Sequence, residues 1–269
     1  AFAAVSTLQS TNTIVLNASG AGFGPSRANG LFINPIRSDQ TFSTNLLMYN
    51  STTGELSYLS QYLPTNVYAT ANQISIGSNA GILNQLSFAI AIGVQAGSNT
   101  QGNQSIAIGL NAGTNTQGLI SVAIGTGAGQ NNQGGNSVAI GRLAGAANQG
   151  TNSVALGYGA GFNAQGQTAI AIGFGAGSNV QGTQSIAMGI FAGGSNQQGS
   201  AIAIGNLAGN TSQQLFGVAI GSAAGGVTQG ANAIAVGQNT GYFVQGSVAV
   251  AMGFQSGFSN QGTNAVAIG

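Results

Sequence analysis

The chain has 269 residues, of which 43% are hydrophobic and 47 are glycine, but it has no tryptophan and only 7% aromatic residues. Large side chains are too few to fill a thick globular core, so we expect a thin architecture. Three arginines, one aspartate and one glutamate give a net charge of +1, which excludes the clustered basic surface that nucleic acids and anionic membranes require.

The side chains that are missing argue against catalysis. Without His, Cys or Lys, the chain cannot assemble an acid–base pair, a nucleophile–base pair or a metal cluster. Asp39 and Glu55 could meet in space like the two carboxylates of a glycosidase, but the rest of the chain supplies no carboxylate. We therefore expect no enzyme, no catalytic residue, no cofactor and no metal. No apolar run approaches the roughly 18 residues of a membrane-spanning helix.

Residues 1–68 differ in composition from the rest of the chain. They hold all three prolines and every charged residue except Arg142. Residues 14–20 look like a degenerate coil start, and residues 47–58 are typical of a β-hairpin around a Gly-containing turn. We predict an N-terminal cap or assembly segment over residues 1–68, because solenoids need such a piece to protect a terminal strand edge.

From residue 69 to 269 the chain is a strict 16-residue repeat. Glycine recurs every 16 residues from Gly77 to Gly269, thirteen times without insertion, which defines twelve coils. A second Gly follows four residues later, and a Gln follows four residues after that. Such a period predicts an all-β fold, a parallel β-solenoid in which each coil stacks on the next.

Each coil contains one three-residue segment of the type Ile-Ala-Ile. Alternation at period two places both aliphatic side chains on one face of a short strand and the Ala on the other. We predict that the aliphatic ladder forms the core and that the Ala ladder forms a flat outer assembly face against sister chains. The alternative is that crowding within a thin coil restricts side-chain size at the Ala position. The predicted assembly face includes Ala107, Ala123, Ala139, Ala155 and Ala171.

The Gln of each coil is as regular as the glycines. Stacked amides can bond to identical neighbours one coil away and to corner carbonyls, so a structural ladder is favoured over a polar array that binds a ligand. The ladder consists of Gln85, Gln101, Gln117, Gln133, Gln149, Gln165, Gln181, Gln197, Gln213, Gln229, Gln245 and Gln261.

Two further features bear on the surface. The three residues before each Gln vary freely, as at 98–100, 162–164 and 242–244, which indicates an exposed edge. The sequence also stops part-way through a coil, so we expect either more sequence or another subunit stacked there. Sequons for N-glycosylation begin at Asn17, Asn50, Asn103 and Asn210, a weak indication of an extracytoplasmic surface.

The Ser-Ile-Ala-Ile-Gly-x-x-Ala-Gly and Asn-Ser-Val-Ala-Ile-Gly units at 105–113 and 136–141 resemble the YadA-like head repeats of trimeric autotransporter adhesins. This resemblance implies a left-handed parallel β-roll, three chains around one axis, and attachment to host surfaces. The period of 16 departs from the family's, which is nearer 14, and no neck, stalk or anchor is visible. Residues 31–37 and the 47–58 hairpin look like segments of fibre proteins from giant viruses and tailed phages.

These features lead to one functional expectation and two alternatives. We expect a structural subunit of an extracellular, cell-surface or virion-surface fibre that assembles with itself, as a homotrimer or end to end. The first alternative is an adhesin head whose edges bind a host glycan or receptor. The second is an ice-binding solenoid, although a regular Thr-rich face is missing and the exposed positions are too mixed.

Overall fold

The computed structural model describes residues 14–17, 31–34, 46–49, 56–59, 67–70 and 72–269. The described residues form β-strands and turns and no helix, so the all-β prediction is confirmed. The chain divides into two compact units, Ala1–Tyr62 and Leu63–Gly269. Asp39, Asn50 and Glu55 lie outside the described residues.

The described residues of the first unit form two pairs of strands. β1 (Ile14–Asn17) pairs in parallel with β2 (Leu31–Asn34), and the pairing of Ile14 with Leu31 joins positions 17 residues apart, close to the 16-residue period of the repeat. β3 (Leu46–Tyr49) pairs antiparallel with β4 (Leu56–Leu59), which is the pairing that the predicted hairpin requires.

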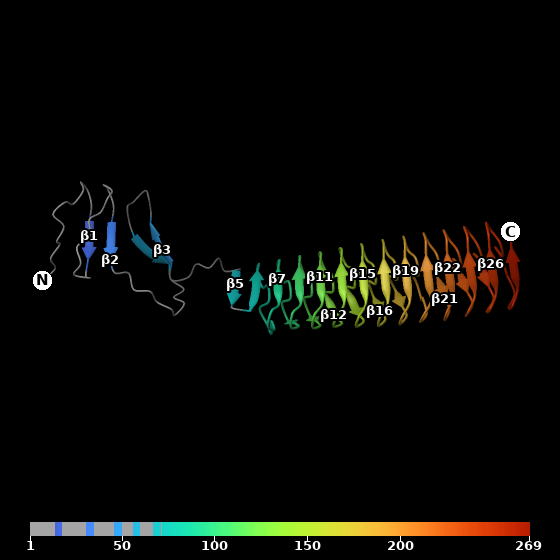
Figure 1. Cartoon of the computed structure of the whole chain (residues 1–269), viewed down its shortest axis with the longest axis horizontal. Coiled ribbons are helices and arrows are strands. Elements are labelled where there is room, and N and C mark those ends of the chain that lie inside the picture. The colour runs from blue at the N-terminus through green and yellow to red at the C-terminus, as the bar shows by residue number, and fades with distance from the viewer. Residues whose placement is uncertain (1–13, 18–30, 35–45, 50–55, 60–66, 71) are drawn as a thin grey trace. The chain divides into compact units, whose positions relative to one another are not determined.

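The second unit is the predicted parallel β-solenoid, and Figure 1 shows its strands stacked one coil after another. Its long sheet has 14 strands, beginning with β5 (Val67–Thr70), which pairs antiparallel with the first coil. The unit therefore begins a few residues before the predicted boundary at 68. The other strands are β6 (Gln73–Ile76), β7 (Ile90–Ile92), β9 (Ile106–Ile108), β11 (Val122–Ile124), β13 (Val138–Ile140), β15 (Val154–Leu156), β17 (Ile170–Ile172), β19 (Ile186–Met188), β20 (Ile202–Ile204), β22 (Val218–Ile220), β24 (Ile234–Val236), β26 (Val250–Met252) and β27 (Val266–Ile268).

A second ladder of short parallel strands runs along the opposite wall and is centred on the Gln of each coil. Neighbouring Gln residues pair with each other, as Gln101 does with Gln117, and isolated bridges continue the ladder through Gln85, Gln197 and Gln261. The strands are β8 (Thr100–Gln101), β10 (Thr116–Gln117), β12 (Asn131–Gln133), β14 (Ala147–Gln149), β16 (Ala164–Gln165), β18 (Val180–Gln181), β21 (Ser212–Gln213), β23 (Thr228–Gln229) and β25 (Val244–Gln245).

The core lies on the opposite face of the long sheet from the one predicted. Every described hydrophobic residue that is buried is an alanine, and the cluster includes Ala107, Ala123, Ala139, Ala155 and Ala171, all 0% exposed. The prediction of an outward Ala assembly face was therefore wrong. The aliphatic side chains on either side of each Ala point outward instead, and the crowding alternative is the correct one.

The physical reason is the narrowness of the coil. The Gln side chain crosses the interior from the second ladder to the long sheet, where Gln101 Nε2 donates to the carbonyl oxygen of Ile90 at 2.7 Å. A wall-to-wall distance that one Gln side chain spans leaves room only for methyl groups on the facing strand. Ile and Val still favour the strand conformation, and they do so from its outer face.

Close approach also fixes the two glycines of each coil. A Cβ at Gly141 would lie 2.6 Å from the carbonyl oxygen of Gly157 in the next coil. A Cβ at Gly177 would lie 2.6 Å from Gln181 Oε1 in the interior. Real Cβ atoms essentially never approach other atoms this closely. The first Gly of a coil is therefore required by the backbone of the next coil, and the second Gly is required by the Gln side chain of its own coil.

Candidate functional site

The Gln ladder lies inside the solenoid. The Nε2 group of each Gln from Gln101 to Gln261 donates to a long-sheet carbonyl oxygen at 2.7–2.9 Å, as in Gln165 to Val154. Some of these amides also bond along the rod: each of four donates to the next Gln at 3.0–3.1 Å, namely Gln85, Gln197, Gln213 and Gln229.

Burial bears on the choice between a structural ladder and a ligand array. The Gln side chains from Gln101 to Gln245 are at most 3% exposed, so solvent and ligands do not reach them. Several Oε1 atoms in the ladder, including that of Gln165, accept no hydrogen bond and rest against a glycine instead. The contacts of the ladder are thus internal ones, between the two walls of each coil and between neighbouring coils.

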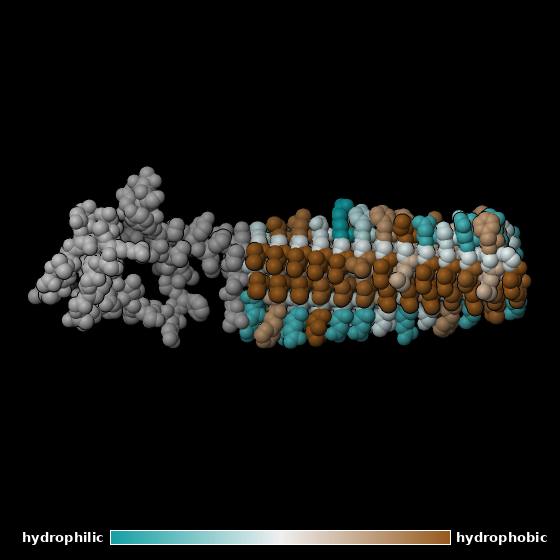
Figure 2. All heavy atoms as spheres, turned by 45° about the horizontal axis from the view of Figure 1, so that its top comes forward, coloured by the Kyte–Doolittle hydropathy of each residue, from teal (hydrophilic) through white to brown (hydrophobic). Residues whose placement is uncertain are grey.

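The outward aliphatic side chains form a continuous surface, which we call the aliphatic face. It consists of the first and third residues of the Ile-Ala-Ile-type segment, which give two side chains in each of thirteen strands from β6 to β27. All are Ile, Val, Leu or Met, and none is buried. Figure 2 shows the face as an unbroken brown band along the solenoid.

The aliphatic face is large for a surface exposed to water. At a strand spacing of about 4.8 Å it is roughly 58 Å long, and two side chains of a strand span roughly 11 Å, for roughly 600 Å². The largest apolar patches on monomeric proteins are about 300–600 Å², and a partner in a stable interface buries about 800 Å². This face is therefore at the size at which an interaction site is expected.

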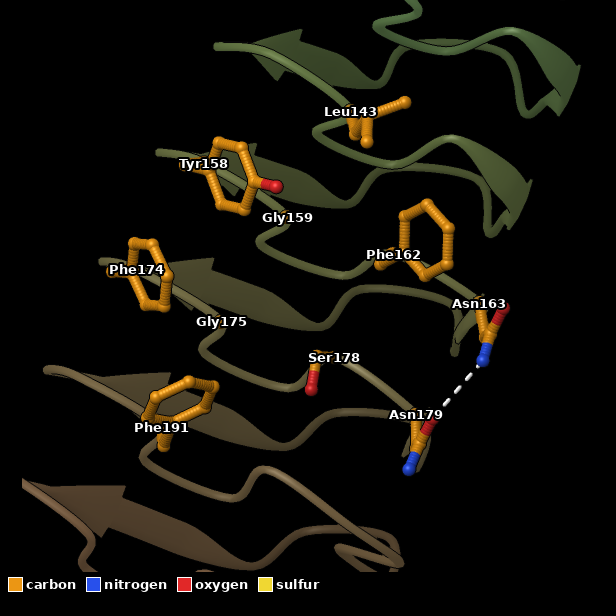
Figure 3. Close-up of a pocket in the computed structure, with 10 residues that line it drawn as sticks. All are labelled: Leu143, Tyr158, Gly159, Phe162, Asn163, Phe174, Gly175, Ser178, Asn179 and Phe191. Atoms are coloured by element: carbon orange, nitrogen blue, oxygen red, sulfur yellow. Dashed lines mark hydrogen bonds between the residues drawn. The ribbon is translucent and has the colours of Figure 1, made fainter.

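A second feature is an open hollow of about 340 Å³ on another side of the solenoid, which we call the aromatic hollow. Figure 3 shows Tyr158, Phe174 and Phe191 along one side and Phe162 across from them, with Gly159 between. The Tyr158 and Phe174 rings stack with their centroids 5.0 Å apart, and Phe191 meets Phe174 edge to face at 5.1 Å.

The variable three-residue stretches before each Gln are only partly exposed: some of their residues face solvent and others are buried or half-buried. Asn99 is exposed while Ser98 is 7% exposed, and Asn163 is exposed while Phe162 is half-buried. The exposed asparagines bond along the rod, as Asn163 Nδ2 does to Asn179 Oδ1 at 3.0 Å. Such amides offer both donors and acceptors next to the aromatic hollow.

The four sequons differ in accessibility. Asn103 is exposed and Asn210 is half-buried. The Ser of the first of these sequons, Ser105, is fully buried and donates to the carbonyl oxygen of Gly102 at 2.7 Å. Asn17 lies in β1, whose side chains are outside the description.

The part of the chain that the structure describes contains no group of three His, Cys, Asp or Glu side chains that could hold a metal ion. Over the same residues there is no helix that could cross a bilayer. Arg142 is the charged residue of the solenoid, and its guanidinium carbon lies 5.3 Å from the centroid of the Tyr158 ring.

In the comparisons with known proteins, no family model, no curated protein and no solved structure matches this chain.

Proposed function

We propose that this chain is a structural subunit of an extracellular or virion-surface fibre, in which copies of the solenoid associate side by side through the aliphatic face. The observation that carries the proposal is the outward orientation of the Ile and Val ladders along the whole long sheet. A single chain leaves this surface in water, whereas association removes it from water and is favoured by about 25 cal/mol per Å² of buried apolar surface.

A second copy of the same chain fits this surface better than an unrelated partner does. The face repeats every coil, so a parallel neighbour in register presents the same side chains at the same heights. It contains no charged or polar side chain, which removes any need for a complementary charge pattern. Copies related by an axis along the rod form a closed ring, and three copies would match the arrangement that the sequence resemblance implies.

Lysine substitutions on the aliphatic face test this proposal. Ile140 and Ile172 lie two coils apart on the face, and Ile140→Lys with Ile172→Lys would place two charges in the contact. We expect the unchanged chain to have a multiple of the 26.2 kDa chain mass in light scattering, and the double variant to have the mass of one chain. Burying unpaired charge costs several kcal/mol in an interface, whereas a Lys on an exposed sheet face is tolerated.

The matched control places the same charge elsewhere. Gln167 is exposed at a turn of the coil between β16 and β17, so Gln167→Lys should leave the mass of the assembly unchanged. Circular dichroism of all variants checks that the solenoid is intact. A monomeric mass for the unchanged chain at high concentration would contradict the proposal.

A second candidate function is adhesion, with the solenoid as a head that binds a glycan or a receptor of a host. The aromatic hollow favours it, because rings and amides gather there on a surface separate from the aliphatic face. Both functions are compatible in one molecule, since one uses the long sheet and the other uses a turn of the coil. Both also place the protein outside the cell or on the virion surface.

A further inference from the structure

We infer that the aromatic hollow is a binding site for a neutral hexopyranose, either free or as a residue of a glycan. The inference deepens the adhesion candidate by giving it a site and a ligand class. It does not depend on side-by-side assembly, because the hollow lies outside the aliphatic face.

The hollow exists because of two glycines at one position of the repeat. This position, two residues after the first Gly of each coil, holds Leu143, Gly159, Gly175 and Phe191 in four successive coils. A Cβ at Gly175 would meet Phe191 Cδ1 at 2.6 Å, so the side chain at this position leans over the preceding coil. In the coil after Gly159 this position is Gly175, which has no side chain to cover Gly159.

The space over Gly159 is open because Gly175 lacks a side chain. A Cβ added there would meet no heavy atom within 4 Å, whereas one added at Gly127 would meet Leu143 Cδ2 at 2.8 Å. The floor of the hollow is thus the backbone at Gly159, closed at its two ends by Leu143 and Phe191. Its volume, about 340 Å³, is at the lower end of the roughly 300–1,000 Å³ of small-ligand sites.

The walls combine apolar rings with neutral polar groups. Tyr158 and Phe174 are 43% and 46% exposed, and Phe162 stands across the hollow from them. On the Phe162 side, Asn163 Nδ2 donates to Asn179 Oδ1, and Asn179 Nδ2 donates to Ser195 Oγ at 3.3 Å. These bonds leave Asn163 Oδ1 and the second N–H of each amide available to a ligand. A pyranose has an apolar C–H face for the rings and hydroxyl groups for the amides.

Charge distinguishes a sugar from the other ligand that aromatic rings attract, a quaternary ammonium ion. The lining contains no carboxylate, and the guanidinium of Arg142 already lies over the Tyr158 ring. A cation in the hollow would lie next to this positive charge without a counterion, whereas a neutral sugar carries no such penalty.

Saturation-transfer NMR on the full chain tests the inference, with the methyl glycosides of glucose, galactose, mannose and N-acetylglucosamine as probes. We expect at least one glycoside to receive saturation at millimolar concentration. We expect Gly159→Leu to abolish the signal, because its Cβ would enter the open space at the floor of the hollow and the rest of its side chain would occupy the end next to Leu143. Leu is compatible with the backbone here, because Leu143 and Leu207 occupy the same repeat position at φ of 58° and 56°, close to the 61° of Gly159.

The matched control is Gln95→Leu. Gln95 is exposed and occupies the same repeat position in a coil outside the hollow, so this variant should keep the signal. The inference is overturned if no glycoside binds the unchanged chain, if Gly159→Leu binds as well as the unchanged chain, or if choline competes the sugar away. Light scattering on the same samples separates the two proposals, since Gly159→Leu should lose the sugar and keep the assembly.

Discussion

The interior and the aliphatic face of the solenoid belong to the same three-residue strands, yet their residues differ in how much they vary from coil to coil. In β17, Ala171 points inward and is fully buried, while Ile170 and Ile172 point outward and remain partly exposed. In the strands of the long sheet from β7 to β27 the inward residue is always Ala, whereas the outward residues vary among Ile, Val, Leu and Met. The position that never varies is the one with the least space.

The inward residues and the Gln side chains hold a coil together, whereas the outward aliphatic side chains remain available to a partner. The interior gains little apolar burial from methyl groups, so backbone ladders and the Gln bonds across the coil carry much of its order. The large aliphatic side chains add strand propensity and contact their neighbours along the rod, but they keep apolar area exposed. Three substitutions test this division, and their expected effect on stability decreases from the interior to the outer face.

Enlarging an inward residue should have the largest effect. Ala171→Leu adds a branched side chain to a slot that Gln181 crosses to reach the carbonyl oxygen of Ile170. We expect a loss of about 3 kcal/mol or more in the free energy of unfolding, because an overpacked core must displace backbone. Urea denaturation measures this loss. Ile172→Leu on the outer face is the control and should cost less than about 1 kcal/mol; equal costs would contradict the assignment of the two faces.

Removing one bond of the Gln ladder should have an intermediate effect. Gln165→Leu keeps a similar volume but deletes the Nε2 donor to Val154 O at 2.7 Å and to Ala169 O at 3.4 Å. We expect a loss of about 1–3 kcal/mol, the cost of leaving a buried partner without its donor. Hydrogen exchange should show faster opening of the coils next to residue 165. Gln167→Leu, at an exposed position, should leave exchange unchanged there.

The period and the strand positions could be predicted from the sequence, because each follows from residue types alone. Glycines every 16 residues fix the number of coils, and β-branched residues on both sides of an Ala fix a strand. The pairing of β3 with β4 followed from a Gly-containing turn between apolar runs. The boundary at 68 stays a prediction; the two compact units divide at Leu63, and the antiparallel pairing of β5 with β6 does not follow from the repeat.

The direction of the strand faces could not be predicted by hydrophobicity, which places Ile and Val inside. The constancy of the Ala carried the correct signal, since a surface position tolerates more change than a narrow interior does. The aromatic hollow was also missed, although residues 162–164 were predicted to form an exposed edge. Its open floor at Gly159 depends on how side chains at one repeat position lean over the preceding coil, and that lean exists only in three dimensions.

Truncating an outward residue should have the smallest effect on an isolated chain. Ile172→Ala removes a side chain that is partly exposed, so we expect a loss of about 1 kcal/mol in dilute solution, below the roughly 2–5 kcal/mol of a fully buried Ile. In the assembled state the same side chain is buried by a neighbour, and the cost should rise. The measurement is thermal unfolding at low and high chain concentration. In a background that carries two lysines on the same face, Ile140→Lys and Ile204→Lys, which should prevent assembly, the two concentrations should give the same cost. A full core-like cost at low concentration would instead mean that the outer face already belongs to the core of a single chain.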